Sequence, residues 1–230
     1  MQKCKKWKRE KWMLSIVFSA VITGFCMLLT GCSETELEER CFPMLAAAGY
    51  EDGRVTFDAA FPKTGDAAKA DASGGDTSSQ GIQVSGGRAF TFENSKKKWE
   101  NRLNKEADYN HLKIVVIEEE LIQEREAYQK MMDYLAETEV FPRNTYVCAV
   151  EDMEDLFELE QKLPQDLGTY IEEFIKMHEE ESGHILTLGD LLDEKENQSM
   201  ILYMPYLEIE DGFVEWNGYV NILGEIWQDF

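Results

Sequence analysis

The 230-residue sequence predicts a mixed α/β (α+β) fold, in which a central mixed sheet built on a βαβ unit carries flanking helices and antiparallel hairpins. The run 112–117 is apolar except for Lys113 and rich in β-branched residues, which is typical of a strand covered on both faces. A helical pattern and a second apolar run at 146–150 follow it. Two Asp-Gly pairs, Asp52-Gly53 and Asp211-Gly212, separate β-like runs elsewhere and predict hairpins.

The helix of the βαβ unit is predicted from apolar residues that recur three, four and seven positions apart. These residues are Leu121, Tyr128, Met131, Met132 and Leu135. Glu124, Arg125 and Glu137 fall on the opposite face. We expect the helix to end before Pro142, since the residue that precedes a proline avoids helical backbone angles. No glycine-rich phosphate loop joins the strand to the helix, so the unit predicts a fold and no chemistry.

The remaining elements follow from the same patterns. In the first hairpin, at 44–61, we expect Val55, Phe57 and Ala59 to be buried and Thr56, Asp58 and Ala60 to face water. Helices are expected at 92–107, at 153–163, from Asp166 to Ser182, and from Thr187, the N-cap, to Leu192.

The sequence divides into four parts. We expect residues 1–31 to form a lipoprotein signal peptide, on the grounds given below, and residues 32–43 to form a polar tether. Residues 44–195 form an α/β domain, with a flexible loop at 62–87 that is too poor in apolar residues to pack. Residues 196–230 form a C-terminal β-hairpin that could begin a truncated second domain.

The N-terminus predicts export and lipid attachment. A basic start precedes the uncharged segment 13–31, and Leu29, Thr30, Gly31 and Cys32 resemble the lipobox of bacterial lipoproteins, in which the cysteine is lipidated. An uncleaved membrane-spanning anchor is the alternative, because nineteen uncharged residues can just cross a bilayer. Both interpretations place the body of the protein outside the cytoplasm.

The charge excludes a class of partner. Residues 1–31 carry six Lys or Arg and one acid, a net charge of +5, so the chain's −22 leaves −22 − 5 = −27 for residues 32–230. Such a body repels phosphate backbones, and we expect no nucleic-acid partner. It also repels anionic lipids, so membrane attachment is expected to come from the N-terminal lipid.

No catalytic, cofactor or metal site is expected. His178-Glu179 begins like a zinc helix, but Ser182 occupies the place of the second histidine, and His184 lies beyond a glycine. His111 opens the central strand as a polar residue at its edge. The run 118–120, three glutamates after a parallel strand, could bind a cation or supply general acids, but it also suits the positive end of the following helix.

The two cysteines of the body, Cys41 and Cys148, could form one disulfide. Two buried thiols are the commoner state of free cysteine, and we prefer that interpretation. Cys148 lies within a strand rather than at a helix N-terminus, so it does not look like a nucleophile.

A family resemblance connects several of these segments. The lipobox, Glu36-Leu37, the run 109–117 (YNHLKIVVI) and the segment 143–147 (RNTYV) resemble the N-terminal domain of the Ger(x)C family of spore germination lipoproteins. The likeness covers about residues 29–222, without the loop at 62–87 and without the family's usual C-terminal region. The resemblance implies a non-enzymatic C subunit of a nutrient germinant receptor, anchored through Cys32 on the outer face of the inner spore membrane. It further implies assembly with integral-membrane subunits of the A and B types.

Two other functions remain open from the residues alone. A lipid-anchored extracytoplasmic solute-binding protein would need a concave, partly apolar pocket with converging polar groups. A cell-wall hydrolase would need paired carboxylates in a cleft, and 44 acids on residues 32–230 make chance pairs inevitable.

Overall fold

The computed structural model describes residues 39–62, 88–138, 140–182, 186–197, 202–221 and 226–227. All of these residues belong to one compact unit, residues 38–230. The expected signal peptide and almost all of the expected loop at 62–87 lie outside the described residues.

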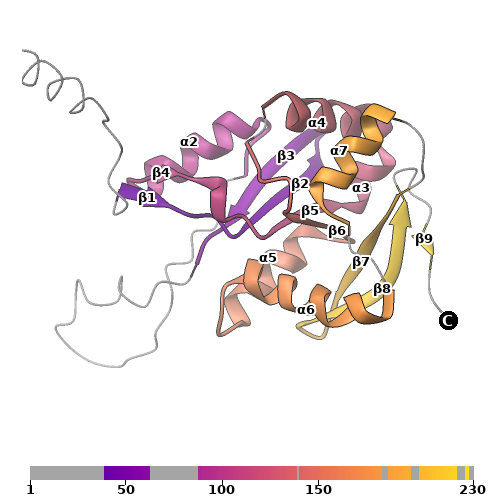
Figure 1. Cartoon of the computed structure of the whole chain (residues 1–230). Coiled ribbons are helices and arrows are strands. Elements are labelled where there is room, and N and C mark those ends of the chain that lie inside the picture. The colour runs from indigo at the N-terminus through magenta and orange to yellow at the C-terminus, as the bar shows by residue number, and fades with distance from the viewer. Residues whose placement is uncertain are drawn as a thin grey trace, which may run out of the picture. The chain divides into compact units, whose positions relative to one another are not determined.

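A seven-stranded mixed sheet runs through this unit in the order β3-β2-β5-β6-β7-β8-β9 (Figure 1). The four central strands, β2, β5, β6 and β7, are parallel neighbours, and β3, β8 and β9 add antiparallel edges. The strand bounds are β2 Leu45–Glu51, β3 Arg54–Ala60, β5 Ile114–Glu118, β6 Tyr146–Val150, β7 Tyr203–Glu210, β8 Phe213–Asn221 and β9 Ile226–Trp227. The mixed α/β fold and its parallel βαβ unit are confirmed.

Helices cover both faces of the sheet (Figure 1). One face carries α2 (Phe92–Leu103), α3 (Glu119–Gln123), α4 (Arg125–Thr138) and α7 (Leu188–Asn197), and the other carries α5 (Met153–Lys162) and α6 (Leu167–Ser182). Successive residues of a strand point to opposite faces. Val115 and Ile117 therefore enter the first core, and Ile114 and Val116 the second.

The predicted helical stripe is confirmed, since its five apolar members are all buried. The helix is nevertheless divided, because the backbone leaves helical angles at Glu124. The helix expected to reach residue 107 ends at Leu103, where Asn104 takes a left-handed φ of 50°. A two-stranded parallel pair of β1 (Arg40–Cys41) and β4 (Glu106–Ala107) follows.

The first hairpin has the expected turn, with positive φ at Asp52 and Gly53. The prediction that Thr56, Asp58 and Ala60 face solvent is wrong in part, because Thr56 is only 4% and Ala60 only 2% exposed. Ala60 is buried by the second helical layer, because it packs with the α5–α6 core although β3 is an edge strand.

The second hairpin continues the same sheet. Ala149 and Val150 of β6 pair with Tyr206 and Leu207 of β7, in parallel.

Gly168, near the start of α6, lies directly against the backbone of Met44: a Cβ atom there would be 2.5 Å from the Met44 carbonyl oxygen.

Candidate functional site

Two of the three glutamates at 118–120, Glu118 and Glu119, have structural partners. The Glu118 carboxylate accepts hydrogen bonds from the backbone N–H of Tyr50, at 2.8 Å, and of Met153, at 3.3 Å. It thereby ties the end of β2 to the first turn of α5. Burial, the largest effect, raises the pKa of Glu118 although both N–H groups favour its ionised form.

Gly49 gives this carboxylate its room. A Cβ atom at Gly49 would lie 2.7 Å from Glu118 Oε2 and 3.1 Å from the Thr56 hydroxyl. The other two glutamates diverge: Glu119 accepts a hydrogen bond from the Tyr206 hydroxyl, and Glu120 is exposed. No group of three or more His, Cys, Asp or Glu side chains in the described ranges could hold a metal ion.

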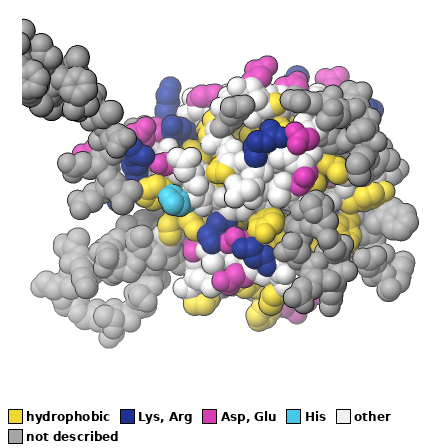
Figure 2. All heavy atoms as spheres, viewed as in Figure 1, with side chains coloured by type: hydrophobic (Ala, Val, Ile, Leu, Met, Phe, Trp, Pro, Cys, Tyr) yellow, Lys and Arg dark blue, Asp and Glu magenta, His cyan; other side chains and the backbone are white. Residues whose placement is uncertain are grey.

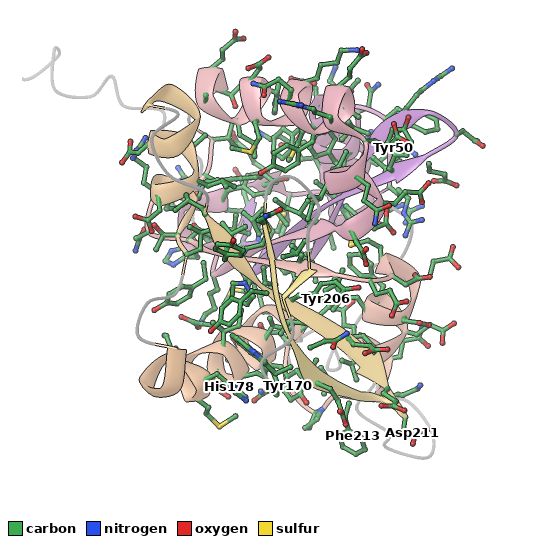
Figure 3. The ribbon with its side chains drawn as sticks, turned by 90° about the vertical axis from the view of Figure 1, so that its right-hand side faces the viewer. Tyr50, Tyr170, His178, Tyr206, Asp211 and Phe213 are labelled. Atoms are coloured by element: carbon green, nitrogen blue, oxygen red, sulfur yellow. The ribbon has the colours of Figure 1, made fainter. Side chains whose placement is uncertain are left out.

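The described histidines pack against aromatic rings. His178, on α6, stacks on Trp216 of β8 with the ring centroids 4.8 Å apart, beside the β7–β8 hairpin (Figure 3). Its Nδ1 lies 2.9 Å from the Phe174 carbonyl oxygen. His111 belongs to a 3-10 turn before β5 and meets Phe42 edge to face. His184 and the side chain of Ser182 lie outside what the structure describes.

The expected buried thiols are confirmed. Cys41 and Cys148 are free, and they belong to the cores on opposite faces of the sheet. Burial raises the pKa of the Cys41 thiol to about 11, and it also raises that of Cys148. Neither thiol is activated as a nucleophile.

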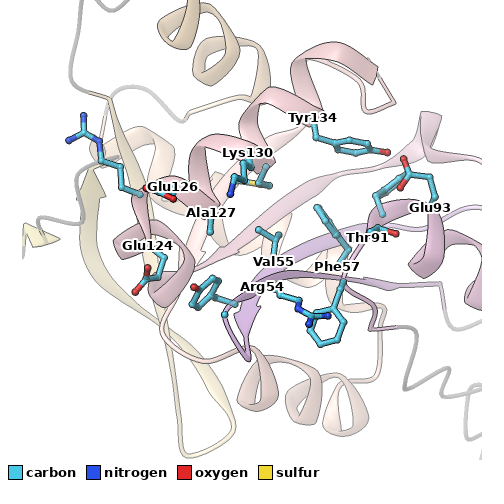
Figure 4. Close-up of a pocket in the computed structure, with 16 residues that line it drawn as sticks. Arg54, Val55, Phe57, Thr91, Glu93, Glu124, Glu126, Ala127, Lys130 and Tyr134 are labelled. Carbon is cyan, nitrogen blue, oxygen red and sulfur yellow. The ribbon is translucent and has the colours of Figure 1, made fainter.

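A groove of ≈ 760 Å³ lies between the β2–β3 hairpin and α4 (Figure 4). An aromatic cluster lines it, in which the ring centroids of Phe57 and Phe92 are 6.0 Å apart and those of Phe92 and Tyr134 are 5.7 Å apart. Val55, Ala127 and Met131 add further apolar surface.

Charges of both signs line the same groove: Arg54, Arg125 and Lys130 against Glu93, Glu124 and Glu126. The Arg54 guanidinium lies 5.0 Å from the centroid of the exposed Phe90 ring. Burial and a hydrogen bond to Glu93 raise the pKa of Tyr134. The only side-chain hydroxyls of the lining are those of Tyr50, Thr91 and Tyr134, and Thr91 Oγ1 caps α2 by accepting from the Asn94 N–H at 3.2 Å.

Sequence reasoning missed this groove. Its walls come from residues about 70 positions apart, and each side chain alone looks like an ordinary solvated charge or core aromatic residue. The predicted attachment site is not tested by the structure, because Cys32 and the lipobox residues Leu29, Thr30 and Gly31 lie outside the described residues. Within the described part of the chain, no helix has the length and apolarity needed to cross a bilayer.

Comparison with known proteins identifies a family. The model of the spore germination protein N-terminal domain matches residues 33–209, from the residue after Cys32 to the last residue but one of β7. No curated protein and no solved structure matches the chain. The matched segment covers more than half of the chain, so this protein belongs to the Ger(x)C family of spore germination proteins, whose N-terminal domain it contains.

Proposed function

We propose that the protein is a lipid-anchored accessory subunit of a nutrient germinant receptor. It acts through assembly with integral-membrane subunits of the A and B types and performs no chemistry of its own. The lipid is attached to Cys32, and the folded domain lies on the extracytoplasmic face of the inner spore membrane.

The family match at 33–209 carries this proposal. The match begins directly after Cys32. Cleavage at a lipobox takes place before the cysteine, so Cys32 would be the N-terminal residue of the mature protein. Two candidate reactive groups also support a scaffold rather than a catalyst. The Glu118 carboxylate is hydrogen-bonded to the backbone of Tyr50, and the Cys148 thiol is packed in the hydrophobic core.

Co-purification from spore membranes tests the proposal. The full-length protein, tagged at its C-terminus, is solubilised from inner spore membranes in a mild detergent and recovered through the tag. We expect two multi-spanning proteins of the A and B types to be recovered with it. Recovery of the lipoprotein alone, with both proteins present in the starting membranes, would overturn the receptor-subunit proposal.

The groove favours a second candidate function, a lipid-anchored solute-binding protein. Its volume of ≈ 760 Å³ falls within the roughly 300–1,000 Å³ typical of small-molecule sites. Apolar rings and charges of both signs would suit a small zwitterionic solute with an apolar side chain. Thermal-shift screening tests this: a ligand should raise the Tm of the wild type but not of Lys130→Ala, and the exposed, distant Lys162→Ala serves as the control. A screen in which no solute raises the Tm of the wild type more than that of Lys130→Ala would overturn this candidate.

A further inference from the structure

We propose that α2 and the segment 88–90 form a membrane-facing basic surface that binds anionic lipid headgroups. This inference rests on the proposed lipidation of Cys32 and adds a second, electrostatic contact that orients the domain. We call it the α2 surface.

The α2 surface reverses the sign of the protein's charge locally. Residues 88–105 contain six cations and two acids, Glu93 and Glu100, so their net charge is 6 − 2 = +4, in a chain whose net charge is −22. The cations are Arg88, Lys96, Lys97, Lys98, Arg102 and Lys105. Figure 2 shows Lys and Arg side chains at the end of the domain where α2 and β1 lie.

The helix leaves Lys97, Lys98 and Arg102 exposed to solvent. Phe92, Ser95 and Trp99 are buried against the core, which fixes the rotation of α2. Lys97 and Lys98 therefore lie outward and are exposed. The two acids lie among these cations: Glu93 precedes Lys97 by four residues, and Lys96 pairs with Glu100 at 3.6 Å.

A shallow depression of ≈ 470 Å³ marks the centre of this surface. Two lysines, two asparagines, Arg88 and Phe90 line it, together with Glu51, Thr56 and Ala89; the lysines and asparagines are Lys97, Lys98, Asn94 and Asn101. Lys98 Nζ donates to the Arg88 carbonyl at 2.6 Å, which holds its ammonium at the rim. Phe90 is 43% exposed, and an exposed aromatic ring beside cations is typical of surfaces that enter the headgroup region.

The short segment between Cys32 and β1 limits how far the lipid anchor can lie from the α2 surface. Arg40 opens β1 eight residues after Cys32 (40 − 32). Eight residues of fully extended chain span at most roughly 28 Å. Arg40 pairs with Glu106, directly after the end of α2. A lipid on Cys32 therefore holds the end of α2 near the bilayer.

Charge and distance favour lipid as the occupant. Each Lys or Arg near an anionic leaflet contributes about 1 kcal/mol. Glu51 and Glu154 each lie 3.9 Å from Arg88 and offset part of this charge, whereas acids farther than about 8 Å are screened at physiological salt.

Lysine acylation on vesicles tests the α2 surface. The full-length lipidated protein is reconstituted into phosphatidylcholine vesicles with or without phosphatidylglycerol and treated briefly with an amine-reactive acetylating reagent, and each lysine is quantified by mass spectrometry. Phosphatidylglycerol should reduce acetylation of Lys97, Lys98 and Lys105 at least threefold, and added salt should restore it. Lys162, on α5 at the opposite face of the sheet, is the internal control and should not change.

Variants and a phosphate arm make the outcome specific. Lys97→Glu/Lys98→Glu should abolish the lipid-dependent protection of Lys105, and Lys130→Glu/Lys162→Glu should leave it unchanged. Equal acetylation on the two vesicle types would overturn the proposal, as would equal protection by inorganic phosphate on phosphatidylcholine alone. The intact mass separates the two proposals: a protein without acyl groups on Cys32 refutes the anchor, and its flotation with phosphatidylglycerol vesicles then tests the α2 surface alone.

Discussion

Glu118 and Tyr50 are joined by a 2.8 Å hydrogen bond from the Tyr50 N–H to Glu118 Oε2, although 68 residues separate them. The second oxygen of the same carboxylate accepts from Met153, so one side chain connects β2, β5 and α5.

Glu118→Ala should lower the free energy of unfolding by about 2–4 kcal/mol, because it leaves two partly buried N–H groups without an acceptor. Glu118→Gln should lower the free energy of unfolding by about half as much, since its amide offers one acceptor oxygen in place of two. Urea unfolding measures both, with the exposed Glu120→Ala as the control. Equal stability of all three variants would show that the contact contributes nothing.

Asp58 gives the protein a pH-dependent stability. Burial raises the pKa of this carboxyl to about 6 although Arg88, Arg102 and Lys98 lower it. Its pKa when unfolded is near 3.8, so the folded state binds more protons between pH 4 and 6 and this group's contribution falls as pH rises through that window. Asp58→Asn should stabilise the protein at pH 7 by at most about 3 kcal/mol and should have little effect at pH 4. Thermal unfolding at the two pH values decides this, and a gain that is the same at both would contradict it.

Tyr128 carries a buried hydroxyl with no hydrogen-bond partner among the described residues. Tyr128→Phe should therefore raise the free energy of unfolding by about 1 kcal/mol, because it removes a desolvated polar group and keeps the ring. The exposed Tyr203→Phe should change it by less than about 0.5 kcal/mol. A loss of stability in Tyr128→Phe would reveal an unrecognised partner.

Lys113 and Glu172 explain the one charge in the central apolar run. Lys113 Nζ lies 2.5 Å from Glu172 Oε2, and Lys176 donates to the other oxygen at 2.7 Å. Burial raises the pKa of Glu172, but the hydrogen bonds and charges of both lysines outweigh it and lower the pKa.

Because its folded pKa is depressed, Glu172 stabilises the protein above its unfolded pKa, and this stability is lost as pH falls. Glu172→Gln should cost about 1 kcal/mol at pH 7 and less at pH 3. Denaturant titrations at the two pH values measure the difference, with the exposed Glu173→Gln as the control.

Cys32 is the predicted attachment point for lipid. Cys32→Ala should abolish labelling with a fatty-acid analogue and shift the protein from the membrane pellet to the soluble fraction, because the predicted lipid anchor is lost. Cys26→Ser, in the same leader, should retain both properties. Lipid labelling of Cys32→Ala would place the anchor elsewhere.

Local patterns predicted most of the fold. The stripe from Leu121 to Leu135, the Asp-Gly turns and the Thr187 cap are set by neighbours in sequence, and each forms as expected. Thr187 and Asp190 even exchange hydrogen bonds as a capping pair: the Thr187 N–H donates to Asp190, and the Asp190 N–H donates to Thr187 Oγ1.

Long-range pairing could not be predicted in the same way. Burial of Ala60 depends on a helical layer formed by α5 and α6, about 100 residues later in the chain. The groove depends on the approach of Phe57 to Tyr134, and the role of Glu118 on Tyr50 and Met153. No local periodicity encodes these contacts, since tertiary packing decides them.

The two free thiols have a practical consequence for spectroscopy. Cys41 and Cys148 are shielded on opposite sides of the sheet, and burial keeps both in the unreactive protonated form. A maleimide dye should therefore leave both unmodified and attach to a single cysteine introduced at the exposed Asp211, at the turn between β7 and β8. The native domain thus accepts a site-specific fluorophore, with which its distance to a labelled bilayer can be followed by energy transfer.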